Sequence, residues 1–174
     1  MNEHDEYLRL VLDYLKTNWL NPNTGIVAAG IFLSKTKYVL ATSTLQKQGV
    51  WNHAEYNAFK RYEKVISNDY SNSTLVITLS PCLFKNQKSR NGISCSELIL
   101  KRNFKSIFVG FIDEKQAPQG YTDYQKIDLE FEISHHEKNT RLCKDLYSLF
   151  DRFGTDINDN LLDIKKAVYS DVFK

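Results

Sequence analysis

The sequence predicts an α/β fold: a three-layer α/β/α sandwich around a mixed sheet of about five strands. Apolar, β-branched runs alternate along the chain with amphipathic segments of helical spacing, and this alternation is typical of such sheets. Clusters of Asn, Gly, Pro and Ser separate the runs and mark turns. With 174 residues, of which 42% are hydrophobic, the chain is long enough to bury the core of one domain.

The first half of the chain predicts two helices and a hairpin. Apolar side chains follow helical spacing over residues 6–19, and the Asn-Pro-Asn-Thr-Gly sequence at 21–25 ends that helix. The apolar runs 26–33 and 38–42 flank a polar turn, so they predict a β-hairpin. Residues 53–66 predict a second helix, because their alanines and aromatic residues gather on one side.

The second half of the chain predicts three further strands among helices. Residues 74–79 are rich in β-branched side chains and predict a central strand. Residues 127–133 alternate apolar and acidic side chains, which is typical of a half-buried strand. The remaining elements expected before the tail are the strand 106–112 and the helices 95–102 and 138–150.

We expect residues 1–150 to form the main domain and residues 151–174 to be a helical extension of that same domain. Apolar side chains recur at helical spacing in this tail. Those expected to face inward are Leu161, Leu162, Ile164, Ala167 and Val168.

Charge and composition narrow the expected partners and compartment. The net charge is +2 and the isoelectric point 8.3, which is too mild to indicate nucleic-acid binding by itself. The first residues are acidic and lack the layout of a signal peptide, and no apolar stretch is long enough to span a bilayer. Three cysteines are present, an odd number, and two of them are needed by the site described next, so the sequence does not suggest disulfide bonds. We therefore expect a protein of the reducing cytoplasm, without a membrane partner.

His53, Glu55, Cys82 and Cys95 form the most informative constellation of the sequence. One His and two Cys can supply three ligands to zinc, and a catalytic zinc site leaves the fourth position to water. Glu55 follows His53 by two residues at the expected start of a helix, so both can face one pocket and Glu55 can move protons. These are the groups that a zinc-dependent deaminase of nitrogen heterocycles requires.

Each part of this constellation also has a purely structural interpretation. A His-x-Glu triplet arises by chance, a Pro-Cys pair is common, and Cys95 could be a small core residue. Their order favours zinc, because the triplet opens a helix, a strand follows, Pro81 ends that strand, and the second Cys starts the next helix. The spacing is unusual, since twelve residues separate Cys82 from Cys95 where the plain deaminase motif has two.

The ordered motifs resemble a known family. Asn-Pro-Asn-Thr-Gly at 21–25 precedes His-Ala-Glu-Tyr-Asn-Ala at 53–58, and Thr-Leu-Ser-Pro-Cys at 78–82 precedes a polar insert and Cys95. Over residues 6–150 this order resembles the deaminase domain of bacterial riboflavin biosynthesis, the diaminohydroxyphosphoribosylaminopyrimidine deaminase of the cytidine deaminase-like superfamily. Members of that branch widen the gap between the two cysteines with an insert, so the long spacing fits the resemblance.

The resemblance implies roles for individual residues. The metal ligands would be His53, Cys82 and Cys95, the ion would be Zn²⁺, and Glu55 would be the catalytic proton shuttle. The residues that would contact substrate are Asn21 in the turn, Ala54 in the His-Ala-Glu motif, and Lys88 in the insert, for which Lys85 and Arg90 are competitors. The resemblance also implies a homo-oligomer.

Departures from the family pattern surround the expected substrate pocket. Ser80 stands where the family has Glu, Leu83 and Phe84 replace a Ser-His pair, and Thr24 replaces a Val. The sequence therefore predicts the chemistry more firmly than the substrate. The expected function is hydrolytic deamination of a pyrimidine nucleotide-like compound with release of ammonia. The alternatives are deamination of a base in nucleic acid, and a zinc-binding scaffold without catalysis.

Overall fold

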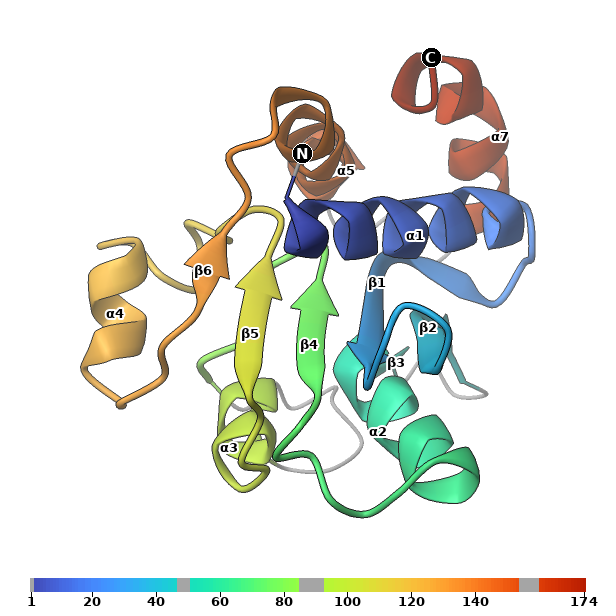
Figure 1. Cartoon of the computed structure of the whole chain (residues 1–174). Coiled ribbons are helices and arrows are strands. Elements are labelled where there is room, and N and C mark those ends of the chain that lie inside the picture. The colour runs from blue at the N-terminus through green and yellow to red at the C-terminus, as the bar shows by residue number, and fades with distance from the viewer. Residues whose placement is uncertain (1, 47–50, 85–92, 154–159) are drawn as a thin grey trace.

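A six-stranded mixed sheet forms the centre of the molecule, with strand order β3-β2-β1-β4-β5-β6. The computed structural model describes residues 2–46, 51–84, 93–153 and 160–174 (Figure 1). The strands are β1 (Thr24–Phe32), β2 (Tyr38–Leu45), β3 (Trp51–Asn52), β4 (Thr74–Ile77), β5 (Ser106–Val109) and β6 (Glu132–Ile133). The helices are α1 (Glu3–Asn18), α2 (Ala54–Val65), α3 (Cys95–Leu100), α4 (Tyr121–Gln125), α5 (Glu137–Phe153) and α7 (Leu161–Val172).

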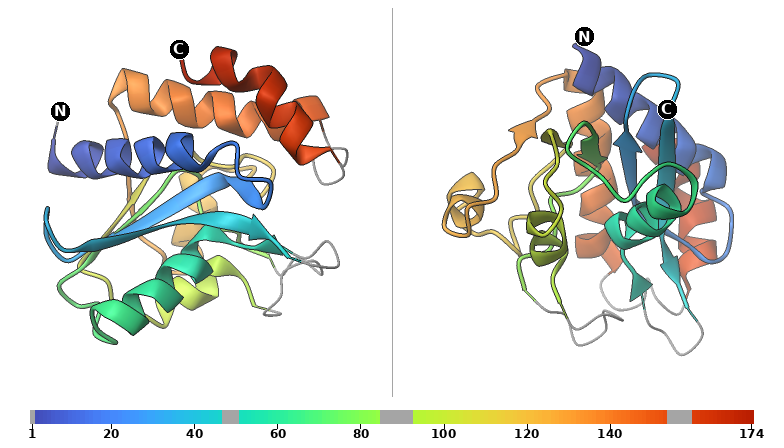
Figure 2. Two further views of the ribbon diagram at one scale, coloured as in Figure 1. Left: turned by 90° about the vertical axis from the view of Figure 1, so that its right-hand side faces the viewer. Right: turned by 60° about the horizontal axis from the view of Figure 1, so that its bottom comes forward.

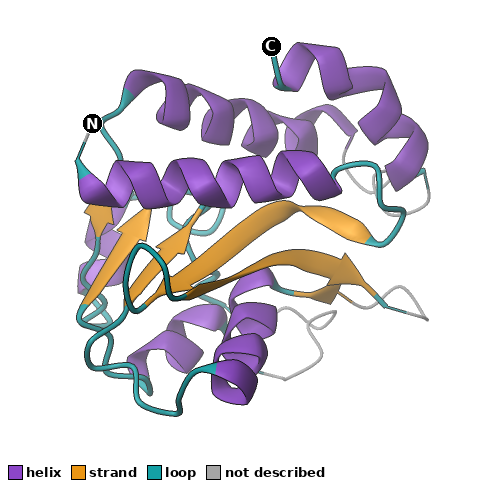
Figure 3. Ribbon diagram, turned by 45° about the vertical axis from the view of Figure 1, so that its right-hand side comes forward, coloured by secondary structure: helices purple, strands orange, loops and turns teal. Residues whose placement is uncertain are grey.

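Helices cover both faces of the sheet, so the predicted α/β sandwich is confirmed. Helices α1, α5 and α7 lie over one face, and α2, α3 and α4 lie over the other (Figure 3). Strand residues alternate between the two apolar layers, as the pleat requires: in β4, Val76 belongs to the first layer, and Leu75 and Ile77 to the second. The sheet has one strand more than the expected five or so, because the short β3 pairs with the end of β2.

Strand directions bring particular chain ends to one edge of the sheet. β1 is antiparallel to both β2 and β4, and β3 is antiparallel to β2, whereas β4, β5 and β6 are mutually parallel. The start of β1, the end of β2, all of β3 and the end of β4 therefore share one edge. The residues next to these ends are where a site can be assembled from distant parts of the chain.

The segment before α5 differs from the prediction. The expected strand 127–133 is reduced to Glu132–Ile133, and the short helix α4 precedes it in a region expected to be loop. Asp128 has a φ of 57°, in the left-handed region, so the backbone turns there and a strand cannot begin at residue 127. The alternating pattern is nevertheless partly realised, since Leu129 and Phe131 point into the core.

The C-terminal tail contains the expected helix, but its inward face is different. Leu161, Lys165, Val168 and Val172 are buried, whereas Ala167 is exposed. These four positions follow i, i+4, i+7 and i+11 spacing, so a lysine occupies a place where the pattern calls for an apolar side chain. Among the described residues, no helix combines the length and apolar character that crossing a bilayer requires.

Replacing Leu15 by Ala should destabilise the protein by about 2–5 kcal/mol, because its side chain is completely buried in the layer between α1 and the sheet. The free energy of unfolding in urea would measure this loss. Leu20→Ala is the control, since Leu20 is 52% exposed and its truncation should cost about 0.5 kcal/mol or less. Equal losses in the two variants would contradict this description of the core.

Candidate metal centre and active site

Local structure fixes each candidate ligand at a junction between elements. His53 is the N-cap residue of α2, with extended backbone (φ −67°, ψ 154°), directly after β3. Cys82 lies five residues after the end of β4 at Ile77 and directly after Pro81, so the strand is shorter than the expected 74–79 and ends before the proline. Cys95 is the first residue of α3, whose N-cap Ser94 forms a capping box with Glu97. His53 and Cys95 therefore start from helix N-termini, and Cys82 lies in the irregular segment after β4.

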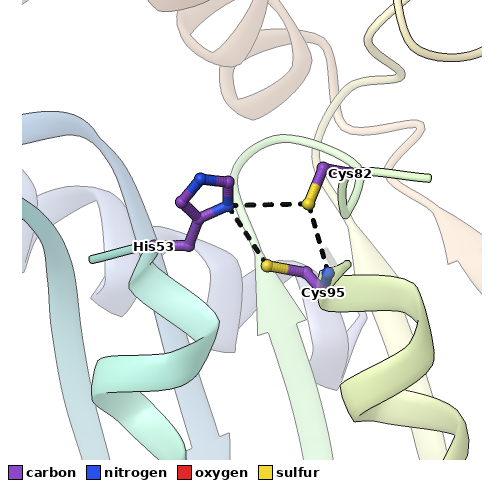
Figure 4. Close-up of side chains that lie close together, drawn as sticks. All are labelled: His53, Cys82 and Cys95. Carbon is purple, nitrogen blue, oxygen red and sulfur yellow. Dashed lines mark hydrogen bonds between the residues drawn. The ribbon is translucent and has the colours of Figure 1, made fainter. Parts of the chain in front are cut away.

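The three predicted ligand side chains lie together (Figure 4). His53 Nδ1 is 3.6 Å from Cys82 Sγ and 3.2 Å from Cys95 Sγ, and the three ligand atoms lie within 4.8 Å of one another. Tetrahedral zinc with ordinary bond lengths separates a nitrogen and a sulfur ligand by about 3.6 Å. The group thus fits a zinc ion with little rearrangement, and its donors, one nitrogen and two sulfurs, are those that zinc prefers.

The two sulfurs share a proton when no metal is present. Hydrogen bonds from Cys95 and His53 lower the pKa of Cys82, and the Cys95 backbone N–H also donates to Cys82 Sγ over 3.1 Å. The same pairing with Cys82, together with burial, raises the pKa of Cys95. The hydrogen bond to Cys82 raises the pKa of His53. The group therefore holds one thiolate ready for a cation.

Glu55 lies beside this group, in the first turn of α2. Its side chain is only 3% exposed, and burial raises the pKa of its carboxyl above the ordinary value. Its carboxyl also interacts with the thiol of Cys95. A buried carboxyl with a raised pKa, next to a candidate metal group, is suited to accept and return a proton.

The Cys82 loop is supported by a residue that the sequence did not single out. The hydroxyl of Tyr124, on α4, donates to Ser80 Oγ over 2.7 Å and to the Pro81 carbonyl oxygen over 3.0 Å. Ser80 Oγ also accepts the Asp113 backbone N–H over 2.9 Å. Ser80, a departure from the family pattern, thus has a structural partner here. Only the tertiary fold brings Tyr124 to it, so no local pattern could have revealed the contact.

A second unpredicted support fixes the start of α2. Asn57 Nδ2 donates to the Thr42 carbonyl oxygen over 2.8 Å and to Thr44 Oγ1 over 3.1 Å. These bonds tie the helix that begins after His53 to strand β2. The sequence contained a signal for this role, because Asn57 belongs to the quoted His-Ala-Glu-Tyr-Asn-Ala motif.

The residues expected to contact substrate have different surroundings. Asn21 is exposed in the turn between α1 and β1, and its Oδ1 accepts the Asn23 backbone N–H. Ala54 is fully buried in the apolar layer under α2, so a contact with substrate would fall to its backbone. Lys88 and its competitors Lys85 and Arg90 lie outside the described residues.

Fold and site together define a cytidine deaminase-like domain with a His/Cys/Cys metal group. Residues 1–111 match the family described as the cytidine and deoxycytidylate deaminase zinc-binding region, and the chain belongs to this family. The match contains His53, Glu55, Cys82 and Cys95. The family assignment and the donor set both indicate zinc as the metal.

The chain is homologous to riboflavin biosynthesis proteins. It is 30% identical over 117 residues to the riboflavin biosynthesis protein RibD of Actinobacillus pleuropneumoniae, covering 66% of this chain and 28% of that protein. The chain thus spans less than a third of this relative.

Solved structures show the same fold at low sequence identity. A diaminohydroxyphosphoribosylaminopyrimidine deaminase/5-amino-6-(5-phosphoribosylamino)uracil reductase of Thermotoga maritima superposes with a TM-score of 0.62 at 19% identity, over 89% of this chain and 43% of that one. RibD of Acinetobacter baumannii gives 0.56 at 20% identity, over 89% and 40%. The Rib2 deaminase of Aspergillus oryzae, a C-terminal deletion mutant, gives 0.56 at 14% identity, over 94% and 98%.

Zinc affinity should fall as the pH is lowered. Zinc takes thiolate and neutral imidazole, whereas the raised pKa values of Cys95 and His53 favour their protonated forms in the metal-free protein. For each proton that zinc must displace from a ligand, the dissociation constant of zinc rises about tenfold when the pH falls by one unit. Competition with a chromophoric chelator between about pH 8 and pH 6 would measure the dissociation constant. A constant independent of pH would contradict this site.

Tyr124→Phe should weaken zinc binding by about 10–100-fold, because it removes the hydrogen bonds to Ser80 Oγ and to the Pro81 carbonyl oxygen, which support the segment before Cys82. Tyr121→Phe is the matched control. Tyr121 lies on the same helix, its ring also packs on Phe131, and its hydroxyl accepts the Phe131 backbone N–H at 3.3 Å, away from the Cys82 loop. Chelator competition, with the thiolate absorption of the cobalt-substituted protein, would compare the variants. Unchanged affinity in Tyr124→Phe would refute this role.

Proposed function

We propose that the chain is a zinc-dependent hydrolytic deaminase of a small nitrogen heterocycle, a pyrimidine nucleotide-like compound as in riboflavin biosynthesis. The observation that carries this proposal is the convergence of His53, Cys82 and Cys95 within 4.8 Å, with the buried Glu55 carboxyl beside them. Ammonia and the oxygenated ring would be the products.

His53, Cys82 and Cys95 are the residues that would hold the metal. Zinc, when bound, supplies a Lewis acid and a water of lowered pKa. The protein contributes the geometry, because the capping box of α3 and the Tyr124 hydroxyl fix the two cysteines. Burial of the group also strengthens each electrostatic contact within it.

Glu55 would carry the protons of the reaction. Its carboxylate would take one proton from the attacking water and deliver it to the ring nitrogen. It would then take the second proton from the hydroxyl of the tetrahedral adduct and pass it to the amine, which leaves as ammonia when the C–N bond breaks and the ring carbonyl forms. Burial raises the pKa of this carboxyl, which brings it nearer to the pKa that a group alternating between acid and base requires. Its position in the first turn of α2 keeps it next to His53 throughout.

The substrate class rests on homology. The relatives are named as riboflavin biosynthesis proteins, and the Thermotoga protein as a deaminase of a phosphoribosylaminopyrimidine. We therefore propose the aminopyrimidine ribosyl phosphate of that pathway as the first compound to test, with Asn21 and Lys88 as contacts. Ser80, Leu83 and Phe84 differ from the family, and a related ring would also be consistent with them. We further propose a cytoplasmic homo-oligomer of one domain, in which residues 151–174 are an extension.

Ammonia release from the zinc-loaded protein, over a panel of nucleosides, nucleotides and the aminopyrimidine ribosyl phosphate, tests the function. We expect turnover of the last compound, and Glu55→Gln should lower kcat by about 10²–10⁴-fold while zinc stays bound near one per chain. Glu63→Gln, in the exposed part of the same helix, should leave kcat unchanged.

Other outcomes would redirect the proposal. Turnover of single-stranded nucleic acid alone, with binding that weakens steeply in salt, would indicate a base deaminase. Stoichiometric zinc without turnover of any compound would indicate a non-catalytic scaffold. Undiminished turnover in Glu55→Gln would remove Glu55 from the mechanism.

A further inference from the structure

Lys165 is the most deeply buried charged side chain of the C-terminal helix α7. Its relative exposure is 0%, although lysine is almost never fully buried without a partner. It lies far beyond residues 1–111, over which the chain matches its family. The expected functions of the site do not account for it.

The ammonium group of Lys165 binds the turn between α1 and β1. Its Nζ donates to the carbonyl oxygens of Asn21 and Thr24, over 2.7 Å in each case. Within the part of the chain that the structure describes, its hydrogen-bond partners are these backbone oxygens and not carboxylates. The lysine therefore binds the turn through the direction of two backbone carbonyl groups and not through an ion pair.

The contact is reciprocal. Trp19, between α1 and the turn, donates its indole Nε1–H to the Lys165 carbonyl oxygen over 2.8 Å, and its ring lies 5.7 Å from the lysine Nζ. Phe173 packs edge-on against the same indole. In the left view of Figure 2 the start of α7 lies beside this turn. Lys165 Nζ thus bonds the turn itself, while the Lys165 carbonyl oxygen and Phe173, the residue after α7, contact Trp19 just before the turn.

The turn lies at the edge of the sheet that carries the metal group. Thr24 pairs with Thr44 in β2, and Thr44 pairs with Asn52 in β3, the residue before His53. The Leu45 backbone N–H donates to the Asn23 carbonyl oxygen over 2.9 Å. The turn held by Lys165 therefore borders the strands from which His53 emerges.

The residue after the turn packs closely on the two neighbouring strands. A Cβ placed on Gly25, just after the turn, would come within 2.6 Å of the Trp51 ring and even closer to Ser43 Oγ. Trp51 precedes His53 by two residues. The start of β1 thus has little room to shift without meeting Trp51 or Ser43.

His53 itself is held by other contacts. Asn57 ties α2 to β2 through two hydrogen bonds, and the three ligand side chains approach one another directly. Loss of the Lys165 bonds would consequently loosen the turn and leave the metal group in place. This separates an effect on substrate binding from an effect on chemistry.

We propose that Lys165 is a positioning residue of the active site, through which helix α7 holds the 21–24 turn as a fixed wall of the substrate pocket. The proposal rests on the deaminase function proposed above. A methionine at this position would fill the same space without the cost of desolvating an ammonium group. Packing alone therefore does not require a lysine here, whereas the two hydrogen bonds to the turn do. Burial lowers the pKa of Lys165 to about 8, in keeping with such a setting.

Lys165→Met tests the proposal in the full-length, zinc-loaded protein. It keeps the length of the side chain and leaves both carbonyl oxygens without their donor. We expect KM to rise roughly tenfold while kcat and zinc content stay within about twofold, because an ordered wall affects binding more than chemistry. Lys166→Met is the control, since Lys166 is exposed and its Nζ lies 3.6 Å from Asp163 Oδ1 on the same helix, in an ion pair that does not involve the turn. An unchanged KM, or a fall in kcat with KM constant, would overturn the proposal.

Hydrogen exchange of the metal-free protein gives a second readout that needs no substrate. Faster exchange of amides over residues 21–25 and at Leu45 in Lys165→Met, with α2 and β4 unchanged, would show that Lys165 orders the turn, and the KM measurement then assigns that order to substrate binding. Exchange equal to that of Lys166→Met would overturn it. Should Lys165→Met fail to fold, Trp19→Phe removes the indole donor together with part of the buried ring and should raise KM in the same direction; no rise would overturn the proposal.

Discussion

The convergence of three side chains from separate segments is the constraint on which the rest of the structure depends. His53, Cys82 and Cys95 come from a helix start, a strand end and another helix start, and no local interaction brings them together. Two sulfurs and an imidazole at such short range compete for protons unless a cation is present. The fold must therefore hold the group in place before any metal arrives.

Each ligand has its own anchor outside the group. Asn57 fixes the helix after His53, the Tyr124 hydroxyl fixes the backbone before Cys82, and the Ser94–Glu97 capping box fixes the start of the helix at Cys95. The anchors lie on or at the start of α2, α4 and α3, which cover the same face of the sheet, and they bond neighbouring backbone and hydroxyl groups rather than the candidate metal donors. Supports of this kind orient the side chains that bind a metal.

The sequence predicted what local signals determine. The β-branched run 74–79 predicted the strand before Cys82, which the structure shortens to Thr74–Ile77, and the helical pattern over 53–66 predicted the helix that begins after His53. Helix α4 was missed although its end is local: Asp128 is left-handed, and the backbone N–H groups of Asp128 and Leu129 donate to the carbonyl oxygens of Gln125 and Tyr124. The Tyr124 contact could not be predicted, because its bond to Ser80 joins segments 44 residues apart. Ser80 was recognised as a departure from the family, but its partner was beyond any local pattern.

Lys165 shows why binary patterns fail where a charge has a specific task. The pattern placed Ala167 inside and assigned no role to Lys165, whereas the structure exposes Ala167 and buries Lys165 completely. A buried ammonium is costly, and apolar packing of similar volume usually stabilises a helix contact as well or better. The two hydrogen bonds from Lys165 to backbone carbonyl oxygens fix the orientation of the turn, and an apolar side chain could not do so. A helix that ends in the chain's last residues is thereby joined to the edge of the sheet where the metal group lies.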